Sequence, residues 1–267
     1  PSRLGVEAAG VVEAVGDQVT SVSVGQRVAY AGGLGAYAEA CNVPASRLVA
    51  IPDGVTDEIA AASLLKGLTT CYLLTRTYKV TADTTLLAHA AAGGVGLLLC
   101  QWAKHLGATT IGTVGSQAKA ELATANGADH TILYQEEDVV ARVKELTNGK
   151  GVNVVYDSVG KSTYDWSLNS LAPLGMFVSY GNASGNSPAV QPHDLQNKGS
   201  LFFTRPTLAT YSADPKDLNA MADEFFGLVS NGTIKVHVNQ RYALKDLVQA
   251  HIDIEARTTT GSTVIIP

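Results

Sequence analysis

The sequence predicts an α/β protein that combines a doubly wound parallel sheet with a second, barrel-like module. Short apolar runs alternate with amphipathic helical patterns from about residue 84 onward. A glycine-rich turn stands between the first of these runs and the first helical pattern. The part before residue 84 has short alternating segments and no long helical pattern before residue 57. Alternating strands and helices indicate a parallel sheet, whereas short alternating segments indicate antiparallel strands.

The predicted strands of the parallel sheet are continuous runs of β-branched and aliphatic residues, as in strands buried on both faces. Gly107, Gly127 and Gly149 each follow a helical pattern closely, where a left-handed cap favours glycine. Right-handed crossovers then place helices on both faces of the sheet. The expected strands are residues 86–90, 110–114, 131–134, 152–157 and 176–180, and the expected helices are residues 95–106, 117–126, 137–147 and 163–171.

These patterns divide the chain into three parts. Residues 1–80 form the barrel-like module, and residues 81–210 form the domain with the doubly wound parallel sheet. Residues 211–267 contain the end of that domain, followed by a predicted helix at 244–257 and a short strand at 261–267. We expect this last strand to return to the first module.

Composition and charge exclude several classes of protein. The 19 Lys and Arg against 24 Asp and Glu give a net charge of −5 without a basic stripe, so nucleic-acid binding is not expected. Residues 86–100 are apolar but too short to cross a ~30 Å hydrocarbon core easily, so no membrane span is expected. Cys41, Cys71 and Cys100 are scattered and odd in number, which favours a reducing cytoplasm over a disulfide framework.

The strongest motif is the turn that follows the first strand of the sheet. Its sequence AAGGVG, residues 91–96, is a dinucleotide-binding fingerprint with Ala91 in place of the first glycine. Gly93 would let the backbone approach a pyrophosphate, and Gly96 would allow the helix to pack closely on the strand. A merely tight structural turn is the alternative, but the βαβ context favours cofactor binding.

The end of the second strand indicates which dinucleotide binds. An NAD-binding domain carries an acidic residue there for the ribose 2′-hydroxyl. This sequence has Ser116 and Lys119 instead, and no carboxylate before Glu121. A phosphate with −1.5 to −2 charges suits these residues, so NADPH is the expected cofactor. The alternative is that Lys119 is a solvated charge in the first helical turn.

Signals for metal or nucleophilic catalysis are not found in the sequence. The six histidines are isolated and no Cys-x-x-Cys occurs, so no metal is expected. His89, within a buried strand, is predicted to be a core histidine. Ser158 lies in no Gly-x-Ser-x-Gly motif and has no evident base nearby, which argues against a nucleophilic serine.

Several strings resemble the medium-chain dehydrogenases/reductases, whose first domain is a GroES-like barrel. These are GVEAAGVVEAVG at residues 5–16 and VGQRV at 24–28. Zinc-dependent members place a ligand histidine before the glutamate that Glu7 matches, where this chain has Val6. They also have a cysteine within the stretch matched by LKGLT, residues 65–69, and a cysteine-rich lobe that is missing here. The zinc branch is therefore excluded.

The chain is similar over its whole length to the zinc-independent quinone oxidoreductases, the zeta-crystallin-like branch. The similar strings are LLKGLTTCYLL (64–74), HAAAGGVG (89–96), YDSVG (156–160), SYGNASG (179–185) and KGSLFFTRP (198–206). Aligned by these motifs, the chain begins partway into the barrel domain. We therefore expect an N-terminal segment, with several active-site positions, to precede Pro1 in the natural protein.

The resemblance implies a set of cofactor contacts, each of which has a structural alternative. Tyr134 could simply close a buried strand, Gly181 and Asn182 could form a plain turn, and Arg257 could be a cation at a helix C-terminus. No catalytic residue is assigned, because capping or surface roles suit Lys66 and Thr69 equally well. The implied cofactor contacts are Tyr72, Gly93, Gly94, Val95, Gly115, Ser116, Lys119, Tyr134, Val159, Gly181, Asn182, Ala183, Ser184, Pro206, Thr207, Leu208 and Arg257.

The resemblance implies an NADPH-dependent quinone oxidoreductase that transfers hydride to quinones without a metal. Two alternatives remain open. One is an NADPH-dependent reductase of the carbon–carbon double bond of alkenals or enones. The other is a non-enzymatic crystallin-like protein that binds NADPH or RNA. The family also implies a homodimer formed through the cofactor domain.

Overall fold

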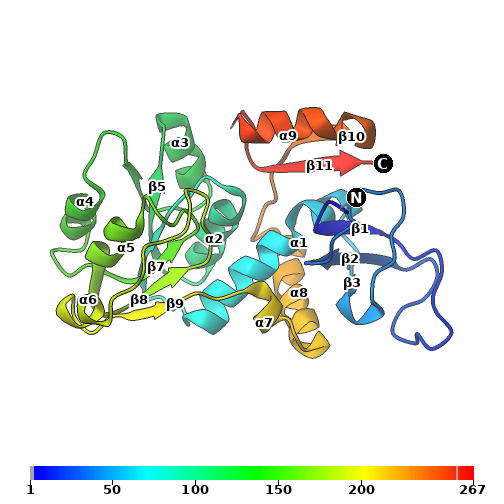
Figure 1. The fold of residues 1–267 in the computed structure, drawn as a ribbon, viewed down its shortest axis with the longest axis horizontal. Coiled ribbons are helices and arrows are strands. Elements are labelled where there is room, and N and C mark those ends of the chain that lie inside the picture. Colours follow the sequence, from blue (N-terminus) through cyan, green and yellow to red (C-terminus); the bar gives the residue numbers. More distant parts are fainter. Residues whose placement is uncertain (1–2, 257) are drawn as a thin grey trace. The chain divides into compact units, whose positions relative to one another are not determined.

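A computed structural model describes residues 3–256 and 258–267 (Figure 1). Its internal contacts divide the chain into two compact units. One unit comprises Pro1–Cys71 together with Leu208–Pro267, and the other comprises Tyr72–Thr207. We call them the split unit and the sheet unit.

The sheet unit contains six parallel strands, which confirms the predicted doubly wound sheet. The strand order is β6-β5-β4-β7-β8-β9. The chain therefore moves outward from β4 through β5 to β6 and then returns to β7, on the other side of β4. The order reverses between β4 and β7, so this is the topological switch point of the sheet. The strands are β4 (Thr85–Ala88), β5 (Thr109–Val114), β6 (His130–Leu133), β7 (Val152–Asp157), β8 (Leu171–Ser179) and β9 (Phe202–Thr204).

The helices of this unit cover both faces of the sheet, as Figure 1 shows. Residues of α2 (Gly94–His105) and α3 (Gln117–Ala125) share one apolar cluster, which includes Cys100 and Val114. Residues of α4 (Val139–Leu146) and α5 (Tyr164–Ser170) share a larger cluster with the opposite side of the strands, which includes Leu87, Ile111 and Phe177. A short helix, α6 (Pro192–Asn197), lies between β8 and β9.

The predicted breaks between elements are confirmed. The apolar run at 86–100 divides into β4, a glycine turn and α2. Gly107, Gly127 and Gly149 have φ of 82°, 99° and 79°, the left-handed conformation that ends a helix. Among the described residues, the helices lack the length and apolar character needed to span a membrane.

The split unit holds two small sheets. Strands β1 (Glu7–Val11), β2 (Arg27–Ala31) and β3 (Val49–Ala50) pair antiparallel, as predicted for the first module. Strand β11 (Ser262–Ile266) pairs in parallel with β10 (Val238–Ala243), and the Ser262 hydroxyl donates to the Ala62 carbonyl at 2.9 Å. The helices are α1 (Asp57–Tyr72), whose last residue belongs to the sheet unit, α7 (Leu208–Tyr211), α8 (Pro215–Ser230) and α9 (Leu247–Glu255).

Helix α1 carries a glycine in its interior because α8 packs against it there. The ring of Phe225 on α8 fills the space that a side chain at Gly67 would need. Glycine costs a helix roughly 0.5–1 kcal/mol relative to alanine. The close contact with a fully buried phenylalanine offsets that cost.

His89 lies in the core of the sheet unit, as predicted, with both ring nitrogens hydrogen-bonded. Its Nδ1 lies 2.9 Å from Thr113 Oγ1, and its Nε2 lies 3.1 Å from Ser167 Oγ. Burial lowers the pKa of His89, and the nearby charge of Asp157 opposes this shift only in part. The imidazole is therefore neutral in the folded protein at neutral pH.

We predict that this histidine makes the protein less stable in mild acid. The unfolded state takes up a proton near the ordinary histidine pKa of ~6.5, whereas the folded state resists protonation until lower pH. The contribution of neutral His89 to the free energy of unfolding is therefore fully present above pH ~6.5 and is lost as the pH falls below that value. Between pH 7.5 and 5.5 this one site should remove at most about 1.4 kcal/mol from the free energy of unfolding, the limit for a folded state that takes up no proton in this range.

Urea unfolding of wild type, His89→Gln and His105→Gln at the two pH values measures the effect. His89→Gln should lose less free energy of unfolding than wild type between the two pH values, by at most about 1.4 kcal/mol. His105 is an exposed histidine of the same unit, and its replacement should change the pH dependence less than His89→Gln does. Equal pH dependence in all three proteins would contradict the prediction.

Candidate functional site

The candidate site lies at the carboxyl edge of the parallel sheet, on both sides of its switch point. Open α/β sheets bind ligands in the crevice outside the carboxyl ends of the strands, where the strand order reverses. Here β4 and β7 pair directly, and the His89 N–H continues the pairing to the Tyr156 carbonyl at 3.0 Å. The loops after β4, β5, β7 and β8 therefore emerge at this edge.

The turn after β4 leads directly into α2 and has no room for side chains. A Cβ on Gly96 would lie 2.6 Å from the Ala91 carbonyl oxygen and still closer to that of Ala90. This is the close helix packing that the fingerprint predicted for Gly96. Gly93 is the N-cap of α2 and no side chain caps the helix. The first N–H groups of α2 are thus left for a ligand, with the positive end of the helix dipole behind them.

The backbone conformation of one residue in this turn was not predicted from the sequence. Ala90 has φ of 54°, a left-handed conformation that is unfavourable for a residue with a Cβ. Its carbonyl accepts the Gly93 N–H at 2.8 Å, which closes the turn before α2. Nothing in the residue type signals this conformation, because alanine normally avoids it.

The residues predicted to surround a 2′-phosphate come together at the ends of β5 and β6. The Tyr134 hydroxyl lies over Gly115, where a Cβ would be only 2.6 Å from it. Ser116 is the N-cap of α3, and its hydroxyl accepts the Lys119 N–H at 3.4 Å. The Lys119 side chain is exposed and forms no ion pair within the described part of the chain. The Tyr134 ring also lies 6.0 Å from that of Trp166.

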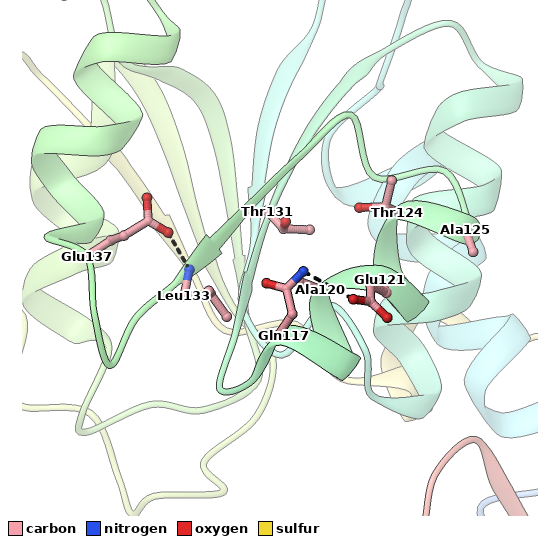
Figure 2. A pocket seen from close by; sticks show the side chains of 8 residues that line it. All are labelled: Gln117, Ala120, Glu121, Thr124, Ala125, Thr131, Leu133 and Glu137. Carbon is pink, nitrogen blue, oxygen red and sulfur yellow. Dashed lines mark hydrogen bonds between the residues drawn. The ribbon is translucent and has the colours of Figure 1, made fainter.

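A hollow of about 510 Å³ lies beside this cluster, between α3 and the edge strand β6 (Figure 2). Two carboxylates face it, and both are engaged. Glu121 accepts from Gln117 Nε2 at 3.2 Å, and Glu137 accepts from the Leu133 N–H at 2.8 Å. Glu121, the first carboxylate after β5, therefore bonds along α3 and lines the hollow. No carboxylate of the described residues lies at the carboxyl end of β5. The remaining lining residues are Ala120, Thr124, Ala125 and Thr131.

The loops after β7 and β8 are joined by backbone hydrogen bonds. The Val159 carbonyl accepts from both the N–H and the hydroxyl of Ser184, each at 2.8 Å. The Ala183 N–H donates to the Ser158 carbonyl at 3.2 Å, and Asn182 bonds Asn186 through its side chain at 3.0 Å. Gly181 lies so close to the backbone of Ser158 that only a glycine fits.

The remaining predicted cofactor contacts lie outside the loops that follow β4, β5, β7 and β8. Pro206 and Thr207 follow β9 in the sheet unit, and Leu208 begins α7 in the split unit. Tyr72 ends α1 and is buried within the sheet unit, where its charge contributes to a raised pKa of Tyr180 that is caused mainly by burial. Arg257 lies outside the described residues.

Arg205 was missed by the sequence analysis. Its Nη1 donates to the carbonyls of Ser179 at 2.8 Å and Gly181 at 3.2 Å, so it fixes the start of the loop after β8. Arg205 directly precedes Pro206 within the string KGSLFFTRP (198–206), which was informative only as a family resemblance. A single arginine after a short strand does not by itself predict that its side chain binds the carbonyls of a distant loop.

In the split unit, Lys66 is partly buried against a carboxylate. Its Nζ lies 2.8 Å from Glu7 Oε1, and Glu7 Oε2 accepts the Leu65 N–H at 2.9 Å. The Thr69 hydroxyl donates to the Leu65 carbonyl at 2.7 Å, within α1. Over the described residues, no group of three or more His, Cys, Asp and Glu side chains is arranged to hold a metal ion.

Two family models match the chain. Residues 94–225 match the model described as zinc-binding dehydrogenase, and residues 1–53 match the alcohol dehydrogenase GroES-like domain. The second match agrees with the barrel-like module predicted from the first strands.

Similar proteins extend over the full chain. The quinone oxidoreductase of Pseudomonas aeruginosa is 56% identical over 268 residues, which cover 100% of this chain and 82% of that protein. The 2-haloacrylate reductase of Burkholderia sp. is 43% identical over 271 residues, covering 100% and 81%. A crystal structure of Escherichia coli quinone oxidoreductase complexed with NADPH matches with a TM-score of 0.97 at 49% identity, covering 100% of this chain and 83% of that one. The predicted resemblance is thus confirmed, and the chain belongs to the quinone oxidoreductase family of the medium-chain dehydrogenases/reductases.

Proposed function

We propose that this protein is an NADPH-dependent quinone oxidoreductase. The observation that carries the proposal is the pair of features at the carboxyl edge of the sheet. An uncapped helix N-terminus follows β4, and a hydroxyl and a lysine follow β5 where a carboxylate would select NAD. Family membership supports the reaction, since relatives are named quinone oxidoreductases and one is complexed with NADPH.

The turn after β4 fits the pyrophosphate of a dinucleotide. Gly93 presents bare backbone, and the N–H groups of Gly94 and Val95 lie in the uncapped first turn of α2. Side chains at Gly93 and Gly96 would contact the Ala90 carbonyl, so glycine keeps this backbone close to the strand. We assign Gly93, Gly94 and Val95 to the pyrophosphate.

The cluster after β5 and β6 suits a 2′-phosphate. Lys119 supplies an exposed cation, and the Ser116 and Tyr134 hydroxyls can each donate a hydrogen bond. Gly115 leaves room for the Tyr134 hydroxyl. We assign Gly115, Ser116, Lys119 and Tyr134 to this phosphate.

The nicotinamide half is assigned to the loops on the other side of the switch point. Their mutual backbone hydrogen bonds make them a fixed surface rather than independent loops. The residues assigned to the nicotinamide half are Gly181, Asn182, Ala183, Ser184, Pro206, Thr207 and Leu208. Val159 is assigned to the adenosine path, and Tyr72 and Arg257 are assigned as further cofactor contacts from the family resemblance alone.

When bound, NADPH supplies the hydride, which a quinone accepts readily because of its high electron affinity. The residues of this chain then bind the cofactor, orient it and exclude water. We assign no acid or base to the reaction, and we propose no metal.

We also propose that the protein is a cytoplasmic homodimer formed through the sheet unit. Cys41, Cys71 and Cys100 form no disulfide in the described part of the chain, which suits a reducing compartment. Among the described strands, β9 is the last of its sheet and pairs with β8, and its Phe202 is 56% exposed, so this edge can accept another strand. The opposite edge, β6, faces the hollow with Glu121 and Glu137, so a two-fold contact there would bring like charges together.

Light scattering of wild type, Phe202→Glu and Val248→Glu tests the dimer. We expect Phe202→Glu to reduce the dimer to a monomer, because the two-fold contact would bury a pair of like charges. Val248 is an exposed apolar residue of α9 in the split unit, so its replacement should leave the dimer intact. A dimer that persists in Phe202→Glu would exclude the β9 edge.

For the 2′-phosphate site, we predict that Lys119→Ala weakens NADPH binding about tenfold and leaves NADH binding unchanged. The lysine would lose a charge-assisted contact that only the phosphorylated cofactor can make. Fluorescence titration with both cofactors measures the two dissociation constants. The matched control is Lys150→Ala, an exposed lysine of the same unit, which should change neither. A full preference for NADPH in Lys119→Ala would overturn the assignment.

A second candidate activity is the reduction of activated carbon–carbon double bonds. It is favoured by the 43% identity with a protein named 2-haloacrylate reductase. Both activities need the same cofactor site, so only the substrate separates them.

We predict that kcat/KM with NADPH is at least about tenfold higher for 1,4-benzoquinone than for 2-chloroacrylate or an alkenal. The quinone needs no additional electrophilic group to accept hydride, whereas a carboxylate-bearing alkene does. Oxidation of NADPH is followed by absorbance, with the rate of the uncatalysed quinone reaction subtracted. A higher value for the haloacrylate or the alkenal would favour the second candidate.

A further inference from the structure

Asp157 is a fully buried carboxylate at the switch point, where β7 ends. Its Oδ1 accepts the Val159 and Gly160 N–H groups at 2.7 and 3.0 Å. Its Oδ2 accepts the hydroxyls of Thr163 and Ser167 at 2.7 and 2.9 Å. All four partners are donors, which is the environment that an ionised carboxylate requires when it is removed from water.

These contacts fix the direction of a longer hydrogen-bond chain. Because the Ser167 hydroxyl donates to Asp157, its oxygen accepts from His89 Nε2, at 3.1 Å. A neutral imidazole that donates from Nε2 must accept at Nδ1, so Thr113 donates there, at 2.9 Å. The chain therefore runs from β5 through His89 and α5 to the end of β7.

Two members of this chain, His89 and Asp157, lie beside the two halves of the proposed cofactor site. His89 directly precedes the turn that carries Gly93 and Gly94. Asp157 binds the backbone of Val159, whose carbonyl in turn accepts two hydrogen bonds from Ser184. The turn after β4 and the loops after β7 and β8 are thus linked through buried side chains of two strands, one helix and the residue that follows β4.

We propose that Asp157, Ser167 and His89 are positioning residues for the cofactor. The hydrogen-bond chain holds the pyrophosphate turn and the nicotinamide-side loops at a fixed separation, so that a dinucleotide finds both ends of its site already in place. This preorganisation increases the affinity for a dinucleotide, and it does so for NADPH and NADH alike. The inference rests on the proposed function for the identity of the ligand.

A positioning role predicts that the affinities for whole dinucleotides fall while the affinity for a fragment does not. A general destabilisation of the fold would lower all of these affinities. Ser167→Ala interrupts the chain between His89 and Asp157 and leaves three donors on the carboxylate. The dissociation constants of NADPH and NADH should both rise about fivefold to tenfold, with their ratio unchanged. The fragment 2′,5′-ADP lacks the nicotinamide half, so its dissociation constant should stay within about twofold. Asp157→Asn, which keeps the side-chain shape, should give the same pattern.

Ser170→Ala is a matched control. Ser170 is another fully buried serine of α5, but its hydroxyl has no hydrogen-bond partner among the described residues. Its replacement should change none of the three constants. Titration calorimetry without quinone provides the measurement, so a failure of the proposed activity would show separately, as absent turnover in a wild type that binds NADPH.

Two results would overturn the inference. One is that Ser167→Ala and Asp157→Asn bind both dinucleotides as tightly as wild type. The other is that they weaken 2′,5′-ADP as strongly as the dinucleotides, since a structural defect would affect every ligand of the unit.

Discussion

The sheet unit depends on the close approach of one helix to one strand. The first turn of α2 can lie against the turn after β4 only because residue 96 has no side chain, since a Cβ there would overlap the carbonyls of Ala90 and Ala91. This approach aims the uncapped N–H groups of α2 outward, at the carboxyl edge of the sheet. In the same turn, Ala90 has a left-handed conformation, at a cost of roughly 1–2 kcal/mol. One strained residue therefore lies where the ligand is expected.

The polar interior of the same unit supports this arrangement. A buried carboxylate is costly unless donors surround it, and Asp157 has four. Three of the four lie within six residues, so the loop after β7 folds around the charge. The fourth, Ser167, joins that loop to His89 and hence to β4 and β5. The switch point is therefore held by buried polar side-chain contacts in addition to the pairing of β4 with β7.

The sequence allowed prediction of features that depend on local pattern. Five buried strands, the glycine turn and the glycines at helix ends all follow from periodicity or from the conformational range of glycine. Strand β9 was missed because Phe202–Thr204 is too short to show a period. The positive φ of Ala90, the two carbonyls that Arg205 binds and the link from Asp157 to His89 were also missed. Each depends on residues brought together by the tertiary fold, 68 positions apart for His89 and Asp157, so no single-sequence pattern encodes them.

The proposed cofactor selection also depends on one residue with two roles. Ser116 caps α3 by accepting the Lys119 N–H, which uses a lone pair of its hydroxyl and leaves the hydroxyl proton free to be donated. An aspartate at this position could cap the helix equally well, but it would offer only acceptors and would repel a phosphate. A serine cap therefore keeps α3 in place while presenting a donor at the end of β5. In the proposed site, the same side chain would thus cap the helix and discriminate between the two cofactors, and Lys119 would supply the charge one turn further along.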